Sequence, residues 1–209
     1  MPSPLRLVLA SASPARLHAL RSAGLEPEVI VSGVDEDGVH ADRVAELVRT
    51  LARLKAEAVH SEVGGRSTDV LVIGCDSLLE LDGTGYGKPR SAAEAVERWR
   101  RMSGRTGVLH TGHHVIRTHR EQTVSRSEVA STTVHFARLS EPEIAAYVAS
   151  GEPLQVAGAF TIDGRGGPFV SGIEGDHHNV VGISLPLLRL MLSELGVAWT
   201  SLWPSGEPC

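Results

Sequence analysis

Lysine is scarce in this chain: of its 20 basic residues, only Lys55 and Lys88 are lysine, and all the others are arginine. Where lysine persists against such a bias, a compact ammonium on a flexible stem is favoured over a planar guanidinium. Lys55 falls on the apolar face of a predicted helix, and Lys88 falls in the glycine-rich turn GYGKP. An unpaired cation is awkward in both places, so the two lysines indicate that an anion binds.

Cysteine and long apolar runs are also lacking. Cys75 and Cys209 are the only cysteines, and Cys209 ends the chain, which argues against a disulfide framework and favours a reducing cytoplasm. No apolar run approaches the ~20 residues that span a bilayer, and the LVLA stretch near the N-terminus is too short for a signal peptide, so no membrane association is expected. A net charge of −5 argues against long nucleic acid as a partner, but leaves room for a small anion in a local cationic pocket.

The remaining composition is that of a folded domain, with 42% hydrophobic and 22% charged residues. Apolar runs that alternate with helical patterns predict an α/β fold with a mixed sheet. We expect strands over 5–10, 26–32, 69–75, 107–116, 122–138, 159–162 and 168–173, and helices over 14–23, 41–60, 91–102, 140–151 and 185–195. No repeat or linker is visible, so the whole chain, 1–209, is interpreted as one domain with a core at about 5–195 and a short C-terminal tail.

A first candidate for chemistry is ASASPAR at 10–16, which joins a predicted strand to a helix N-terminus. Backbone N–H groups and the helix dipole favour an anion there, Ser11 and Ser13 add hydroxyls, and Arg16 adds a cation. The alternative is a plain helix cap at Ser13 with a solvent-facing arginine.

Two carboxylates are further candidates. Asp76 directly follows the buried run 69–75, and ligand sites in open α/β sheets gather beyond the carboxyl ends of strands. Glu36 lies in the acidic loop GVDEDG, and two carboxylates from separate segments suit a hard divalent cation that also binds phosphate. The alternatives are an aspartate that caps a turn and a solvated acidic loop.

Other motifs give weaker evidence for a functional site. GTGYGKP at 83–89 superficially resembles a P-loop, but its spacing is wrong and Pro89 replaces the hydroxyl residue, so we predict a β-turn that presents Lys88. The chain contains no GxSxG nucleophile motif. The histidines lack the spacing of a zinc site and are expected at the surface. They are His110, His113, His114, His177 and His178.

Taken in order, these segments resemble the Maf family of nucleoside triphosphate pyrophosphatases. The resemblance extends from residue 5 to about 195. Its blocks are LVLASASPAR, GVDEDG, LARLKAEAV, VIGCDSLLELDGTGYGKP, SGRTGVLHTG and GAFTIDGRGGPFVSGIEGDHHNVVGISL. Several independent blocks in one order are far more specific than any single motif.

The resemblance implies a mixed twisted sheet flanked by helices, with two lobes around a central cleft, similar to inosine triphosphate pyrophosphatases, in a homodimer. It implies hydrolysis of a nucleoside triphosphate to monophosphate and pyrophosphate, with Mg²⁺ or Mn²⁺. Asp76 is then the general base or a metal ligand, and Glu36 is a second metal ligand. The positions that correspond to phosphate contacts are Ser11, Ser13, Arg16, Lys55 and Lys88.

This chain departs from the family pattern at positions that concern recognition of the nucleotide's base. The branch that prefers dTTP and UTP has Arg, Thr and Gln where this chain has Ala15, Ser77 and Asp163, and Gly107 replaces a common histidine. An ionised carboxylate only accepts hydrogen bonds, so Asp163 favours a base edge rich in donors, such as that of guanine or cytosine. The alternative is that Asp163 only caps its turn.

Two other functions remain open at this stage. The family is also associated with nucleotide-pool sanitation and with arrest of septum formation, so the chain could be a nucleotide-responsive binding protein with a cell-division partner. A phosphomonoesterase or another metal-dependent phosphatase is a third interpretation. Products discriminate among them, because a phosphomonoesterase releases orthophosphate and a pure binding protein releases nothing.

Overall fold

One mixed sheet runs through the computed structural model, which describes residues 5–64, 69–120 and 122–204. The strands are β1 (Arg6–Ala10), β2 (Glu28–Val29), β3 (Asp69–Leu81), β4 (Thr84–Tyr86), β5 (Thr106–His119), β6 (Gln122–Phe136) and β7 (Val170–Glu174). Their order is β2-β1-β3-β5-β6-β7, with β4 paired to β3. β1 is parallel to β2 and β3, whereas all other pairs are antiparallel, which confirms the mixed sheet.

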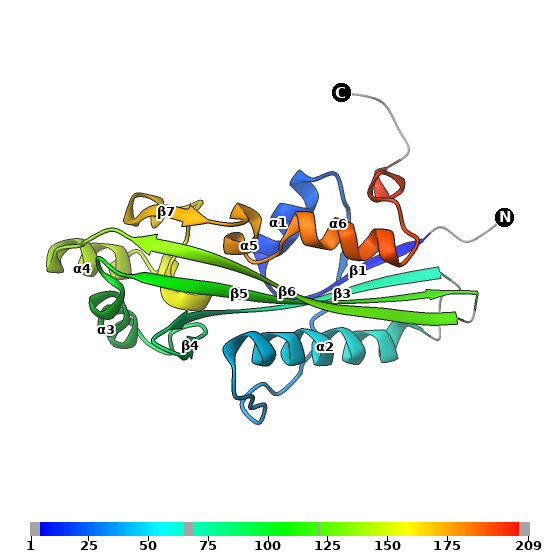
Figure 1. Ribbon diagram of the computed structural model, residues 1–209, viewed down its shortest axis with the longest axis horizontal. Helices are drawn as coiled ribbons and strands as arrows, with labels where there is room; N and C mark the ends of the chain where they lie inside the picture. The colour runs from blue at the N-terminus through cyan, green and yellow to red at the C-terminus, as the bar shows by residue number, and fades with distance from the viewer. Residues whose placement is uncertain (1–4, 65–68, 121, 205–209) are drawn as a thin grey trace.

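Helices cover both faces of this sheet. The helices are α1 (Pro14–Ser22), α2 (Val44–Val63), α3 (Ala92–Met102), α4 (Glu141–Ala149), α5 (His177–Val181) and α6 (Leu185–Glu194). Short 3-10 turns are η2 (Glu152–Gln155), η3 (Ala157–Ala159), η4 (Gly167–Phe169) and η5 (Trp199–Leu202). α2 lies along one face, α1, α5 and α6 lie along the other, and α3 and α4 gather at one end (Figure 1). None of the described helices is both long and apolar enough to cross a membrane.

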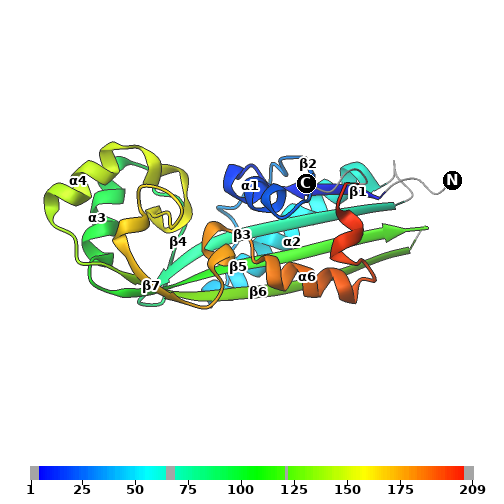
Figure 2. The same ribbon diagram turned by 90° about the horizontal axis from the view of Figure 1, so that it is seen from above.

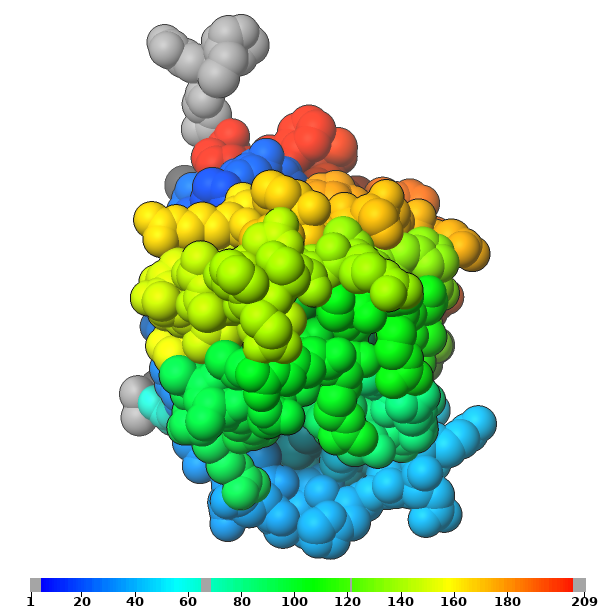
Figure 3. Space-filling view, turned by 90° about the vertical axis from the view of Figure 1, so that its left-hand side faces the viewer, coloured from blue at the N-terminus to red at the C-terminus, as the bar shows by residue number. Residues whose placement is uncertain are grey.

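Two lobes are visible from above, one around α1, α2 and α6 and the other around α3 and α4 (Figure 2). The long strands β3, β5 and β6 cross from one lobe to the other. Figure 3 looks onto the second lobe, where α3 and α4 form much of the surface and the segment before α2 projects below them. The two-lobed α/β architecture expected from the sequence is therefore present.

The first lobe has a core on each face of the sheet, because side chains alternate along a strand. Val70 and Val72 of β3 pack in the core beneath α2, whereas Leu71 and Ile73 pack in the core shared with α1 and α6. All four side chains are fully buried. This explains why 69–75 is an uninterrupted apolar run, since both of its faces are covered.

The second lobe is built around Trp99 of α3, which is fully buried. Its ring makes edge-to-face contacts with Phe136, Tyr147 and Phe169, with ring centroids 5.4–5.9 Å apart. Its indole N–H donates to the carbonyl oxygen of Ala159 at 2.8 Å. Five of the chain's few aromatic side chains, these four and Phe160, therefore gather in one cluster and anchor the chain that follows α4.

Two glycines let α2 lie unusually close to the sheet. A Cβ atom on Gly74 of β3 would come within 2.3 Å of the Ala52 carbonyl oxygen, and one on Gly112 of β5 would come within 2.1 Å of the Val48 carbonyl oxygen. The nearest atoms belong to the helix backbone, so no change of rotamer could make room. These glycines therefore set the distance of α2 from the sheet, and with it the position of Lys55.

The predicted helix starts are confirmed at their caps. The Ser13 hydroxyl accepts from the Arg16 N–H, with Pro14 opening α1. Ser140 and Glu143 form the capping box of α4. These signals are local, so the sequence is enough to locate them.

The predicted end of the central strand is wrong, because β3 continues through Asp76 to Leu81. Parallel pairing with β1 stops at Ala10 and Gly74, but antiparallel pairing with β5 continues as far as Glu80. Asp76 therefore lies in the middle of a strand, at the point where β1 has ended and left one edge of β3 open.

Other expected strands also differ. Only Glu28–Val29 of the strand expected at 26–32 pairs with β1. The strand expected at 159–162 is absent, because Gly158 and Ala159 have positive φ angles and form a 3-10 turn. The strand expected at 168–173 begins only at Val170, after η4, and the short helix α5 was not predicted. Cys75 is a buried free thiol, and Cys209 lies outside the described residues.

Candidate active site

A cleft of about 440 Å³ is lined by both lobes, beyond the end of β1. One side consists of the turn after β1 and the start of α1, with Glu36 and Lys55 nearby. The other side consists of the segment after β4 and the chain at 155–163. All ten residues proposed from the sequence line this cleft: Ser11, Ser13, Ala15, Arg16, Glu36, Lys55, Asp76, Ser77, Lys88 and Asp163.

The turn that enters α1 is held by its own serines. The Ser11 hydroxyl accepts from the Ser13 N–H at 3.2 Å, and the Ser13 hydroxyl accepts from the Arg16 N–H at 3.4 Å. The N-terminus of α1 thus faces the cleft with its dipole, while Ser13 is already engaged as a cap. The cap at Ser13 is therefore present, and the anion site at this helix end stays a prediction.

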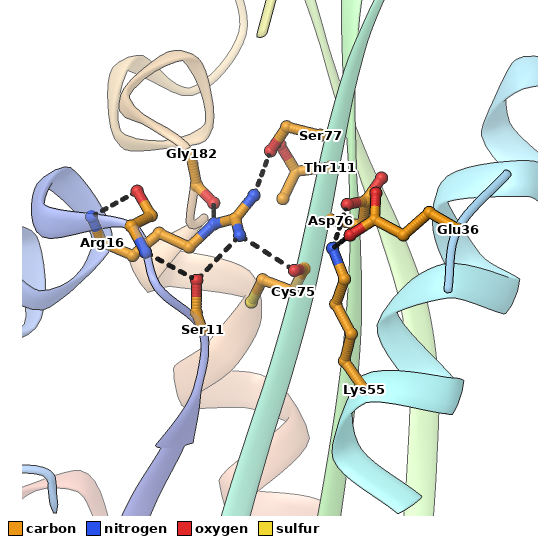
Figure 4. A network of polar contacts seen from close by, with 10 residues as sticks. Ser11, Arg16, Glu36, Lys55, Cys75, Asp76, Ser77, Thr111 and Gly182 are labelled. Carbon is orange, nitrogen blue, oxygen red and sulfur yellow. Dashed lines mark hydrogen bonds and ion pairs between the residues drawn. The ribbon is translucent and has the colours of Figure 1, made fainter. Parts of the chain in front are cut away.

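Arg16 is buried and not solvent-facing, with 9% of its surface exposed. Its Nε donates to the Gly182 carbonyl at 2.8 Å, and its Nη1 donates to the Ser11 hydroxyl at 3.0 Å and to the Cys75 carbonyl at 2.9 Å. Its Nη2 donates to the Ser77 hydroxyl at 2.9 Å (Figure 4). Four of the five guanidinium N–H groups are therefore occupied by protein oxygens. Arg16 ties β1, β3 and the end of α5 together, and one N–H remains for a ligand.

Lys55 projects from α2 to the open edge of β3, where it meets two carboxylates. Its Nζ lies 2.6 Å from Asp76 Oδ1 and 2.7 Å from Glu36 Oε1 (Figure 4). The side chains of Lys55 and Asp76 are 12% and 9% exposed, whereas that of Glu36 is 50% exposed. Lys55 is therefore not the unpaired cation that the sequence indicated, because it pairs with the two acids that the sequence proposes as metal ligands.

Burial dominates the acidity of Asp76 and raises the pKa of its carboxyl group. The positive charges of Lys55 and Arg16 oppose this effect, and the negative charge of Glu36 adds to it. A carboxylate whose pKa moves toward neutrality is a better general base than an ordinary aspartate. Asp76 therefore has the chemistry of a proton acceptor as well as that of a ligand.

The described residues contain no group of three or more His, Cys, Asp or Glu side chains arranged to hold a metal ion. Glu36 and Asp76 nevertheless converge on one point, that of the Lys55 ammonium. Mg²⁺ in nucleotide sites takes one or two carboxylates and completes its shell with waters and phosphate oxygens. The carboxylate pair therefore supplies the oxygen ligands that such a cation takes, at a point that the Lys55 ammonium occupies in this structure.

The cleft lining combines charged and apolar side chains. Lys88 follows β4, is exposed, and forms no ion pair within the described part of the chain. Phe160, Ile162 and Val181 contribute apolar surface, and Asp163 contributes a carboxylate. Charged and apolar groups in one cleft are what a nucleotide requires, since its phosphates and its base differ in the same way.

A family model described as "Maf-like protein" matches residues 6–195. The chain belongs to the Maf family. A relative in Salinispora tropica named "Nucleoside triphosphate pyrophosphatase" is 59% identical, over 97% of this chain and 89% of its own length. Relatives with the same name in Streptomyces coelicolor and Mycobacterium marinum are 58% and 49% identical, over 97% and 96% of this chain and 96% and 97% of their own lengths respectively. A solved HAM1 protein from Coxiella burnetii aligns at a TM-score of 0.43 and 18% identity, over 91% of this chain and 99% of that one.

Sequence reasoning missed the residues of this Maf protein that support the site from behind. The Thr111 hydroxyl bonds the Ser77 hydroxyl at 2.9 Å and donates to the Asn179 carbonyl at 3.3 Å. The Asn179 amide donates to the Leu109 carbonyl at 3.1 Å and to the Thr132 hydroxyl at 3.0 Å. Both Thr111 and Asn179 are fully buried. No clear signal for them is present in the sequence, because Thr111 and Asn179 stand among other polar residues in SGRTGVLHTG and GDHHNVVG.

The expectation of surface histidines is wrong for two members of the cluster. His113 is fully buried and His114 is 4% exposed. The His113 Nε2 accepts from the Ser184 N–H at 2.9 Å, so its Nδ1 carries the proton and donates to the Thr111 carbonyl at 3.0 Å. Burial, assisted by the positive charge of Arg16, lowers the pKa of His113 to about 4. This imidazole is a neutral structural link of the Maf fold.

The buried imidazole predicts a stability that depends on pH. Below its ordinary pKa of 6.5 the unfolded chain takes up a proton that folded His113 refuses until about pH 4, so stability is present above 6.5 and is lost as pH falls through that window. Between about pH 7.5 and pH 5 we expect His113 alone to lower the free energy of unfolding by about 2 kcal/mol. Urea unfolding at the two pH values measures this.

The matched control is His113→Gln, whose amide oxygen can accept from the same Ser184 N–H but does not titrate. The wild type should lose about 2 kcal/mol more than this variant over the same pH interval. Equal losses in the two proteins would contradict a titrating His113. His18→Gln, which replaces an exposed histidine, is a second control. Its free energy of unfolding should fall by as much as that of the wild type over the same pH interval.

Proposed function

We propose that this protein hydrolyses nucleoside triphosphates to the monophosphate and pyrophosphate. The observation that carries the proposal is the contact of Lys55 with Asp76 and Glu36, in a cleft whose lining holds both charged and apolar side chains. The Maf relatives named nucleoside triphosphate pyrophosphatase, aligned over nearly the whole chain, support the same activity.

The charges of the cleft explain why a divalent cation belongs in this proposal. The charged residues that line it are three cations and three anions: Arg16, Lys55, Lys88, Glu36, Asp76 and Asp163. Their formal charges cancel, whereas a triphosphate carries several negative charges. We propose that Glu36 and Asp76 hold Mg²⁺ or Mn²⁺, which supplies the missing positive charge on the phosphates and orients them when bound.

The residues of the chain then divide the work. Asp76 either accepts the proton of the water that attacks the α-phosphorus or, as a ligand of the cation, orients that water. Lys55 stabilises the charge that develops on the phosphates, and Lys88, which has no partner of its own among the described residues, neutralises the outer phosphates. The N-terminus of α1, with Ser11 and Ser13, contributes hydrogen-bond donors, and pyrophosphate leaves.

Product analysis tests this proposal. The purified protein is incubated with GTP, CTP, UTP, ATP and dTTP plus Mg²⁺ or Mn²⁺, and pyrophosphate and orthophosphate are quantified separately. We expect equal amounts of monophosphate and pyrophosphate, and no turnover after chelation with EDTA. Orthophosphate as the first product would instead support a phosphomonoesterase. Nucleotide binding without turnover would support the alternative of a nucleotide-responsive binding protein.

For base selection, the structure distinguishes among the three residues proposed from the sequence. The Ser77 hydroxyl is already bonded to Arg16 and Thr111, so it supports the wall and is not presented to a base. Ala15 contributes only a methyl group to the lining. Asp163 is exposed and lines the cleft next to Ile162, so we propose that it selects bases by accepting hydrogen bonds from them.

Asp163→Gln should therefore change selectivity more than rate. Because Gln both donates and accepts, we expect kcat/KM for UTP relative to GTP to rise by about tenfold. Steady-state kinetics with both nucleotides measures the ratio. The control is Asp42→Gln, which makes the same change at an exposed position outside the cleft lining. An unchanged ratio in Asp163→Gln would remove this residue from base recognition.

Three further expectations complete the proposal. A cytoplasmic location is supported by the buried free thiol of Cys75, which suits a reducing compartment. A homodimer stays a prediction, which light scattering tests. A part in cell division also stays a prediction, and its test is whether the Asp76→Asn variant still alters septum formation in cells.

A further inference from the structure

Part of the cleft wall is an irregular loop, residues 161–166. Thr161, Ile162 and Asp163 of this loop line the cleft. The loop belongs to no helix or strand, so sheet hydrogen bonds do not fix it. A loop that selects among similar bases must nevertheless hold its side chains to a fraction of an ångström.

One carboxylate holds this loop from behind. Glu152 Oε1 accepts from the Thr161 hydroxyl at 2.5 Å, from the Gly166 N–H at 3.1 Å and from the Tyr147 hydroxyl at 3.2 Å. Glu152 Oε2 accepts from the Arg165 N–H at 3.0 Å. The Thr161 N–H donates in turn to the Tyr147 oxygen at 3.1 Å. Both ends of the loop are therefore bonded to one pair of side chains.

The glycines of the DGRGG segment fit this arrangement. A Cβ atom on Gly164 would lie 2.8 Å from Glu152 Oε2, and one on Gly166 would lie 2.4 Å from the Tyr147 oxygen and 2.6 Å from the Thr161 carbonyl. The loop backbone therefore wraps the carboxylate too closely for side chains. The expectation that Asp163 merely caps this turn receives no support, because Glu152 accepts the loop's N–H groups.

Electrostatics agree with this geometry. Burial opposes the charge on Glu152, but hydrogen bonds from Thr161, Arg165 and Gly166 outweigh it and lower the pKa of the carboxyl group. Burial raises the pKa of Tyr147 to about 12, so its hydroxyl stays protonated and remains a donor. Glu152 is thus an acceptor for every group that faces it near neutral pH. Glu152 itself does not line the cleft.

We propose that Glu152 is a positioning residue for base recognition, which holds the 161–166 loop so that Asp163 faces the base of the nucleotide. This inference rests on the proposed function for its consequences in catalysis. The role is indirect, because Glu152 acts through loop amides and the Thr161 hydroxyl. Removal of the Glu152 carboxylate should therefore weaken base binding and reduce the selectivity among bases, without removing the groups that act on the phosphates.

Glu152→Gln tests the proposal. The Gln amide N–H₂ must face a loop N–H or hydroxyl donor, so the loop loses its alignment. We expect KM to rise about tenfold, kcat to change less than about threefold, and the spread of kcat/KM among five bases to narrow by about tenfold. The control is Glu141→Gln, the same change at the exposed start of α4, where Arg100 is the only described partner.

A second readout does not depend on catalysis. Hydrogen exchange at the amides of Arg165 and Gly166 should accelerate at least about tenfold in Glu152→Gln, and should match wild type in Glu141→Gln. Tyr147→Phe, which removes one donor and the acceptor of the Thr161 N–H, should shift KM in the same direction by less. Tyr147→Phe replaces Glu152→Gln as the test variant if Glu152→Gln does not fold.

The outcomes separate this inference from the proposed function. A wild type that hydrolyses no nucleotide would overturn the proposed function, while the exchange experiment would still report on the loop. Unchanged exchange at Arg165 and Gly166 would overturn the positioning role. A lower melting temperature in Glu152→Gln with KM and base selectivity unchanged would also overturn it, because Glu152 would then only stabilise the fold.

Discussion

Asp76→Asn should lower turnover by about 10²-fold or more while leaving the protein folded. The amide cannot accept the proton of the attacking water, and it withdraws a negative charge from the carboxylate pair with Glu36. The same change should leave stability equal or higher. Burial raises the pKa of the Asp76 carboxyl group, so the fold disfavours the charged form, and a neutral side chain of the same shape removes that cost.

Single-turnover pyrophosphate release and urea unfolding at about pH 7.5 measure the two effects. Asp69→Asn is the control, because it makes the same substitution at the other end of β3, where Asp69 pairs with His119. We expect this control to retain turnover. Near wild-type turnover in Asp76→Asn would exclude Asp76 from the chemistry, and loss of turnover together with loss of fold would contradict the expectation that the variant stays folded.

Gly112→Ala should have the largest effect on stability. The added Cβ would meet the Val48 carbonyl at 2.1 Å, and neither atom belongs to a flexible side chain. Either α2 or β5 must shift, and overpacking of this kind costs about 2–3 kcal/mol of unfolding free energy. Because Lys55 projects from α2, the shift also moves its ammonium from Asp76, so we expect turnover to fall at least about tenfold.

The control for this variant is Gly172→Ala on β7. It places the same methyl group in the same sheet, but its nearest neighbour would be the His135 ring at 3.8 Å, an ordinary contact. Urea unfolding and steady-state turnover of both variants provide the comparison. Equal stability of Gly112→Ala and wild type would show that α2 does not rest on the sheet as closely as the structure indicates.

Local signals in the sequence predicted individual site residues, but they did not predict which of these residues meet in the fold. Helical spacing placed Lys55 on the buried face of α2, and capping residues located α1 and α4, because each depends on neighbours within a few positions. The pairing of Lys55 with Asp76 could not be deduced in this way, since it depends on how α2 lies across β3. The family resemblance, and not periodicity, brought those residues together.

The errors have the same physical origin. An apolar run that stops at Asp76 indicates a strand end only if burial ends there, but β5 continues to pair with β3 beyond that point. His113 is buried because Ser184, far along the chain, supplies an N–H to its ring. Glu152 also attracts no notice in the sequence, since its partners are two backbone amides of a loop and two hydroxyl groups. Polar residues satisfied by distant backbone leave no local pattern.

The strands that cross both lobes have a consequence for how a substrate enters. β5 pairs with β3 and with β6 without a register break across the region of the cleft. A hinge needs a few residues free to absorb changes in φ and ψ, and residues in unbroken ladders on both sides have no such freedom. The relative position of the two lobes is therefore fixed, and the width of the cleft between them is set when the sheet folds. Discrimination among nucleotides then depends on fit to a preformed opening, with any movement on binding confined to the loops along its rim.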